Sequence, residues 1–169
     1  MNSKALGYNR PMSHGRSFAL AFALLFTVSC SPSVDLKQAL QITDVSTGYF
    51  DAGITPEGQN KLVPSVTFRL RDTSGELSRI SLNVMYRLAG SGEERDEVFL
   101  QRVNLTNGQT ELLTVRPTFG FTGTPPQSRL DMLKNSNFVD IEAVILARQA
   151  SAQWLELHRV QIERLLITR

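Results

Sequence analysis

Hydrophobic residues from position 35 onwards recur at every second position far more often than at helical spacing. The clearest run is 80–88, where Ile80, Leu82 and Val84 alternate with polar residues. Alternation puts all apolar side chains on one face of a β-strand, because successive side chains point to opposite faces. Gly, Pro, Asn, Asp and Ser separate the runs, as expected of turns. The pattern predicts seven strands, at 40–50, 66–71, 80–88, 98–105, 112–115, 139–148 and 154–166.

In two predicted strands the apolar residues switch part-way from one set of alternate positions to the other, a change of parity. Within 98–105 the apolar positions shift to Val103 and Leu105, and within 154–166 they shift between Leu157 and Val160. One extra residue in a strand, a β-bulge, produces such a shift. Bulges are therefore predicted in the first run and near His158 or Arg159 in the second. A helix over 155–167 is the alternative, and the β-branched residues there favour the strand.

Turn and helix signals lie between the strands. Asn107-Gly108 predicts a hairpin joining 98–105 to 112–115, because both residues accept the positive φ of a type I′ turn. Two glycines and two prolines in 118–128 predict a long loop without regular structure. Ser128, with Asp131 three residues later, predicts the start of one short helix.

Seven strands at this spacing suit two packed antiparallel sheets. The mature part resembles an immunoglobulin-like or fibronectin type III-like sandwich in pattern, although the Cys-Trp-Cys signature of antibody domains is missing. We therefore expect an all-β fold: a seven-stranded antiparallel immunoglobulin-like β-sandwich at 35–169, with one short helix, preceded by a cleaved signal peptide.

Residues 1–29 have the features of a secretory signal peptide. Lys4, Arg10 and Arg16 precede an apolar run that starts at Ser17 and ends at Cys30. A basic segment, an apolar run and a small residue before the cleavage point define such a leader. As a helix the run spans less than about 20 Å, too short for a hydrocarbon core of about 30 Å. The segment therefore predicts export rather than a membrane span.

The end of the leader resembles the lipobox of bacterial lipoproteins. Val28 and Ser29 precede Cys30, the chain's single cysteine, while Thr27 stands where a leucine is usual. The resemblance implies that Cys30 carries a diacylglycerol and becomes the acylated amino terminus, with 30–34 as a short tether. Ser31, in place of aspartate, implies the outer membrane, with the domain facing the periplasm.

Removal of the leader changes the charge balance. Three of the 18 basic residues lie in it and all 16 acidic residues follow it, so the mature charge is 15 − 16 = −1. A net charge near zero gives no support for nucleic acid binding. The predicted membrane attachment is through the lipid alone, since two or three acyl chains need no basic patch.

Few residues suggest catalysis. The chain has no G-x-S-x-G, H-E-x-x-H, phosphate-loop or C-x-x-C motif, and His158 is the single histidine after the leader. Asp140 and Glu142 share a predicted strand face, as do Glu156 and His158 on the next strand. The alternative function is therefore a small envelope hydrolase or metal-dependent enzyme that uses this carboxylate and histidine cluster. The acidic run 93–97 predicts a solvated hairpin loop.

The best candidates for an interaction surface are four aromatic residues, Tyr49, Phe50, Phe119 and Phe121. Loops of a rigid sandwich usually carry its function, although such rings also suit a loop that caps the core. The main prediction is a membrane-anchored envelope lipoprotein that acts as a non-enzymatic binding, accessory or scaffolding module. It has a protein partner in the envelope, no cofactor, no metal and no nucleic acid.

Overall fold

The computed structural model describes residues 34–167, which form two β-sheets and two short helices. The predicted signal peptide and Cys30 lie outside the described residues. Within 34–167 no helix has the length and apolar character needed to cross a membrane. The prediction of an all-β sandwich is confirmed, although the described residues contain two short helices where one was predicted.

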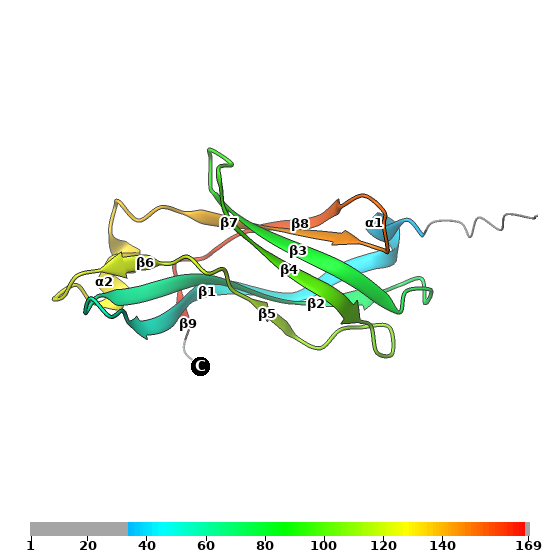
Figure 1. Cartoon of the computed structure of the whole chain (residues 1–169), viewed down its shortest axis with the longest axis horizontal. Helices are drawn as coiled ribbons and strands as arrows, with labels where there is room; N and C mark the ends of the chain where they lie inside the picture. Colours follow the sequence, from blue (N-terminus) through cyan, green and yellow to red (C-terminus); the bar gives the residue numbers. More distant parts are fainter. Residues whose placement is uncertain (1–33, 168–169) are drawn as a thin grey trace, which may run out of the picture. The chain divides into compact units, whose positions relative to one another are not determined.

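The two sheets form two layers (Figure 1). The first has the order β5-β2-β1-β9, with β6 also pairing with β2, and the second has the order β4-β3-β7-β8. All pairs are antiparallel except β1 with β9, which is parallel. The elements are α1 (Leu36–Ala39), β1 (Leu40–Ile54), β2 (Asn60–Asp72), β3 (Arg79–Leu88), β4 (Glu94–Asn104), β5 (Leu113–Val115), β6 (Phe121–Gly123), α2 (Arg129–Lys134), β7 (Ile141–Arg148), β8 (Leu155–Gln161) and β9 (Leu166–Ile167).

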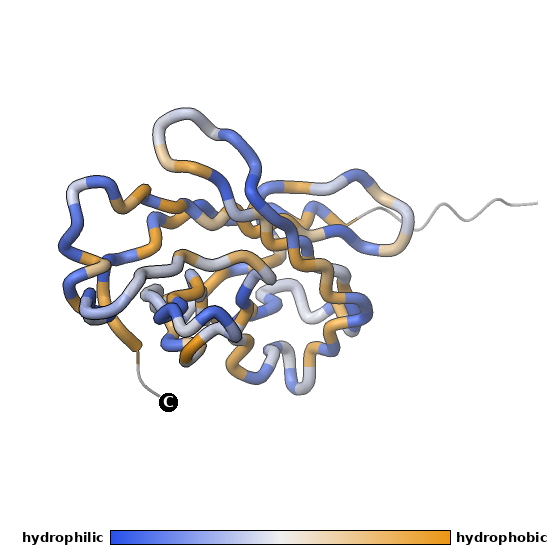
Figure 2. Tube along the Cα trace, turned by 60° about the vertical axis from the view of Figure 1, so that its left-hand side comes forward, coloured by the Kyte–Doolittle hydropathy of each residue, from blue (hydrophilic) through white to orange (hydrophobic). Residues whose placement is uncertain are grey.

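The core lies between the inner faces of the two sheets. Phe68 of β2, Val84 and Tyr86 of β3 and Ile145 of β7 are fully buried. Burial alternates residue by residue along β3, as the sequence pattern predicts. Hydrophobic and hydrophilic segments follow one another along the trace in Figure 2. Each large apolar side chain removed from water contributes about 1.5–3 kcal/mol, so burial is the main source of stability.

Both parity changes mark bulges. In β4, Leu100 pairs with Leu82 and Val103 pairs with Ile80, so two residues of β4 lie opposite one of β3. In β8 the extra residue is Leu157, directly before the predicted position. The residues at 155–161 form a strand, so the helical alternative is wrong.

The Asn107-Gly108 turn forms, but its hairpin does not. Both residues have positive φ, 53° and 76°, as a type I′ turn requires. However, β4 pairs with β3 and β5 pairs with β2, so the segment between them crosses from one sheet to the other. The predicted hairpin is wrong because turn chemistry fixes only the local backbone.

Residues 34–167 form nine strands where seven were predicted, and Pro64 explains one difference. Tyr49, opposite Pro64, donates its N–H to Leu165, away from β2. The pair is therefore not hydrogen-bonded, and the ring nitrogen of Pro64 faces the outer edge of β2, where it has no hydrogen to donate. Because Pro64 cannot donate a hydrogen bond at that edge, two short strands pair there, β5 on one side of Pro64 and β6 on the other. The predicted loop 118–128 thus contains a strand.

The second difference is at the C-terminal end. The predicted strand 154–166 stops at Gln161 and continues as β9 in the other sheet, parallel to β1. Gly48 permits this approach, because a Cβ there would lie 2.8 Å from the carbonyl oxygen of Leu165. Glycine inside a strand often marks such a close backbone approach.

Candidate functional site

Four aromatic side chains from distant parts of the chain meet at the α2 end of the sandwich. Phe121 of β6 lies 6.1 Å from Tyr49 and 4.6 Å from Phe138, measured between ring centroids. Phe138 lies 4.9 Å from Tyr49, and Phe119 lies 6.0 Å from Phe121. Each such pair contributes about 0.5–1.5 kcal/mol beyond burial. The cluster therefore covers this end of the core, and the contacts between its rings hold them in place.

The structure does not bring the four predicted aromatic residues together. Tyr49 and Phe50 are successive residues of β1, so their side chains point to opposite faces of the first sheet. Tyr49 is fully buried, whereas the ring of Phe50 lies 3.7 Å beneath the guanidinium of Arg116. Phe119 and Phe121 join Tyr49 in the cluster. Tyr49 thus belongs to the core rather than to a loop surface, and ligand binding by this set stays a prediction.

Asp96 of β4 fixes the start of the segment that carries Phe119. Its Oδ2 accepts hydrogen bonds from the N–H and hydroxyl of Thr118, at 2.8 and 2.7 Å, and from the N–H of Phe119 at 3.4 Å. Burial alone raises the pKa of Asp96, but these hydrogen bonds outweigh it and hold the pKa below its ordinary value. Asp96 also lies in the acidic run 93–97, of which residues 94–97 belong to β4, so the prediction of a loop there is wrong.

Helix α2 follows the cluster and begins as predicted. The hydroxyl of Ser128 accepts the N–H of Asp131 at 3.2 Å, and the carboxylate of Asp131 accepts the N–H of Ser128 at 3.3 Å. This reciprocal pair is a capping box, which satisfies two backbone donors that a helix start leaves free. It fixes where the helix starts beside β6.

Arg164 fixes the other end of α2. Its guanidinium donates to the carbonyl oxygens of Leu133, Asn135 and Phe138, at 3.4, 3.3 and 2.7 Å. It also pairs with Asp140 at 2.7 Å. The last carbonyls of a helix have no partner within it, so a cation here satisfies them and matches the helix dipole. One side chain thus connects α2 and the loop after it to the start of β7.

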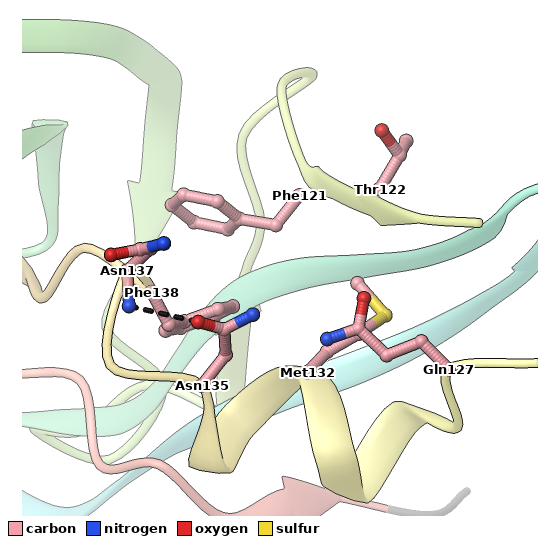
Figure 3. A pocket seen from close by; sticks show the side chains of 7 residues that line it. All are labelled: Phe121, Thr122, Gln127, Met132, Asn135, Asn137 and Phe138. Carbon is pink, nitrogen blue, oxygen red and sulfur yellow. Dashed lines mark hydrogen bonds between the residues drawn. The ribbon is translucent and has the colours of Figure 1, made fainter.

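A pocket of about 140 Å³ opens between β6 and α2 (Figure 3). Its lining combines two aromatic rings, a thioether, a hydroxyl and three carboxamides, from Phe121, Phe138, Met132, Thr122, Gln127, Asn135 and Asn137. The side-chain oxygen of Asn135 accepts the N–H of Asn137 at 2.9 Å. Within residues 34–167 the carboxamides of Gln127 and Asn137 have no hydrogen-bond partner. These donors and acceptors are therefore available to a ligand.

The carboxylate and histidine residues of the alternative function do not form one cluster. Asp140 pairs with Arg164, and Glu142 pairs with Arg159 at 2.6 Å. Glu156 and His158 do not share a face as predicted, because the bulge at Leu157 intervenes. Their partners on β7, Leu146 and Ile145, are successive residues that face opposite sides.

The described part of the chain contains no group of three or more His, Cys, Asp or Glu side chains arranged to hold a metal ion. The ion pairs of Asp140 and Glu142 give these two carboxylates structural partners instead.

Of the residues that line the pocket, only Phe121 was predicted from the sequence as a candidate site residue. Phe138 follows the polar run Lys134-Asn135-Ser136-Asn137 and reads as a lone apolar residue in a loop. The available signal was two asparagines and an aromatic residue between a helix and a strand. That signal is weak, because such segments are common in solvated loops.

Comparisons with known proteins give no identity. No known family model matches this chain, and no curated protein matches it at a significant level.

Proposed function

We propose that this protein is an exported lipoprotein of the bacterial cell envelope whose domain is a non-enzymatic binding module. Acyl chains on Cys30 hold it in the outer membrane, where the domain faces the periplasm. The support for this anchor is the lipobox-like end of the leader and the chain's single cysteine. An unpaired cysteine in an exported protein needs an explanation, and lipid modification supplies one.

We further infer that the sandwich is immunoglobulin-like. In the immunoglobulin lettering, β1, β2, β3 and β4 correspond to strands A, B, C and C′. The pair β5 and β6 corresponds to E, and β7 and β8 correspond to F and G. The two sheets then have the orders E-B-A and C′-C-F-G. Immunoglobulin-like domains divide their strands between two sheets in this way. The correspondence supports a seven-strand plan with one divided strand and β9 as an addition.

The observation that carries the binding proposal is the pocket between β6 and α2. Its lining is neutral and rich in carboxamides and aromatic rings, and a capping box and Arg164 fix the elements around it. Ligand sites commonly combine apolar walls with a few placed polar groups on rigid elements. This arrangement favours recognition of a protein or glycan of the envelope.

The pocket is also placed suitably for an anchored protein. Strand β1 runs from α1, near the start of the described chain, to the aromatic cluster, so the pocket and α1 lie at opposite ends of the sandwich (Figure 1). The four-residue step from Cys30 to Val34 spans at most about 14 Å. With so short a tether, the α1 end stays near the lipid and the pocket stays accessible to other envelope components.

Replacing Cys30 with serine tests the anchor. We expect Cys30→Ser to abolish metabolic labelling of the protein with palmitate and to move it from the membrane fraction to the soluble fraction, because serine offers no thiol to acylate. Ser33→Ala, a change in the same tether, should leave labelling intact. Labelling that persists in Cys30→Ser would refute lipidation at this residue.

A further inference from the structure

We propose that the pocket between β6 and α2 binds one neutral pyranose ring of a glycan. The proposal deepens the binding function proposed above by naming the class of ligand. It rests on the size of the pocket, on its uncharged lining and on the pairing of carboxamides with aromatic rings.

The size of the pocket limits the ligand to about one ring. Its volume is about 140 Å³. An engineered protein cavity of about 150 Å³ accommodates benzene, a six-membered ring. A pyranose with its hydroxyls is larger than benzene, so one sugar ring already fills the pocket and reaches its open rim. The site therefore suits a single sugar unit at the end or side of a glycan.

The polar groups of the pocket match hydroxyl groups. Each carboxamide offers two N–H donors and an acceptor oxygen, and a sugar hydroxyl both donates and accepts. The carboxamides of Gln127 and Asn137 have no partner within the described residues, and the amide nitrogen of Asn135 is equally unengaged. An apolar ligand would gain no hydrogen bond from these carboxamides, and it would cost affinity wherever it displaced their water. A ring that carries several hydroxyls satisfies them.

The charge of the lining selects a neutral sugar. Of the three charged residues of α2, Arg129 pairs with Asp51 at 2.6 Å and Asp131 belongs to the capping box, while Lys134 is exposed and lies outside the lining. No charged side chain is among the residues that line the pocket. A carboxylate placed there would lose water without gaining a cation, which is unfavourable. Uronic acids and other anionic sugars should therefore bind less well.

The aromatic rings supply the apolar side of the site. In Figure 3 Phe121 projects toward Phe138 and the asparagine loop, while Thr122, the next residue of β6, points away. The faces of aromatic rings carry partial negative charge and attract polarised hydrogens. The C–H groups on one face of a pyranose are such hydrogens. Phe121, which is partly exposed, therefore complements the face of the sugar that its hydroxyls leave free, and the buried ring of Phe138 supports it from below.

Saturation-transfer NMR on the full-length lipoprotein tests this assignment. The micelles must be of dodecylphosphocholine, since detergents with sugar headgroups would compete for the site. With aromatic protons of the protein irradiated, we expect transfer to the ring protons of methyl β-glucoside and methyl N-acetyl-β-glucosaminide. Methyl β-glucuronide, which differs from the glucoside by its carboxylate, should bind at least about fivefold more weakly.

Variants then locate the binding. Asn137→Ala and Gln127→Ala should each weaken binding of the neutral glycosides about five- to tenfold, the size expected for one lost hydrogen bond. Gln153→Ala, an exposed carboxamide between β7 and β8, should leave it unchanged. No transfer to either neutral glycoside, equal binding of the glucuronide, or equal affinity in the pocket variants would each overturn the proposal. The Cys30→Ser experiment does not depend on the sugar, so the two proposals can fail separately.

Discussion

Replacing Tyr86 with alanine is expected to lower the free energy of unfolding by about 3–5 kcal/mol, the range for removing a large buried aromatic side chain. Tyr86 is fully buried between the sheets. Its hydroxyl donates a 2.7 Å hydrogen bond to the carbonyl oxygen of Val115 in β5, so it also connects the two sheets. Urea unfolding followed by circular dichroism measures the change. A loss below about 1 kcal/mol would contradict this account of the core.

Two conservative variants separate the hydrogen bond from the packing. Tyr86→Phe should lower the free energy of unfolding by about 1 kcal/mol, because it removes the buried hydrogen bond from the hydroxyl to the carbonyl of Val115. Tyr49→Phe is the matched control: its hydroxyl is buried and has no hydrogen-bond partner within the described residues. That change should be neutral or stabilising. Equal losses in both variants would contradict the assigned hydrogen bond.

Replacing Arg164 with alanine should lower the free energy of unfolding by about 2 kcal/mol and loosen the pocket. The side chain donates to three backbone carbonyls around the end of α2 and pairs with Asp140. Hydrogen bonds from a charged group contribute about 1.5–3 kcal/mol. The lower part of that range applies because the side chain is 35% exposed and solvent screens it. Amide hydrogen exchange should rise in residues 133–140.

Arg159→Ala is the control for Arg164. Arg159 also has acidic partners, Glu142 and Glu156, but it donates to no backbone carbonyl in the described chain. Its loss should change stability far less and leave hydrogen exchange around α2 unchanged. Arg164→Lys should recover only part of the loss, because a lysine cannot reproduce the planar fork of donors. Similar effects of Arg164→Ala and Arg159→Ala would refute a special role for Arg164.

Much of the fold could be predicted because the strands carry a period of two. The alternation over 80–88 identifies the inner face of β3, and the parity changes in β4 and β8 identify real bulges. Strand pairing could not be predicted as well. Asn107-Gly108 specifies a turn, but partners far away in the chain decide which strands lie beside it. Local signals fix local backbone, whereas register depends on tertiary packing.

The candidate site was less predictable than the fold. Tyr49 and Phe50 read as one aromatic pair, yet strand alternation separates them onto opposite faces of the sheet. Phe138 and the asparagines beside it have no distinctive pattern, and hydrogen bonds from Arg164, far along the chain, hold their loop beside the pocket. Because the site is assembled from four segments, no single segment has a sequence pattern that identifies it.

The most direct test of a binding module is photocrosslinking from the pocket rim in the native envelope. A benzophenone amino acid at Ser136, between the pocket residues Asn135 and Asn137, should give a discrete adduct upon illumination. The same probe at Ala152, exposed in the turn between β7 and β8, should not give it, and the adduct should be lost with Cys30→Ser. Absence of an adduct at Ser136, or the same adduct from Ala152, would contradict a binding site at the α2 end.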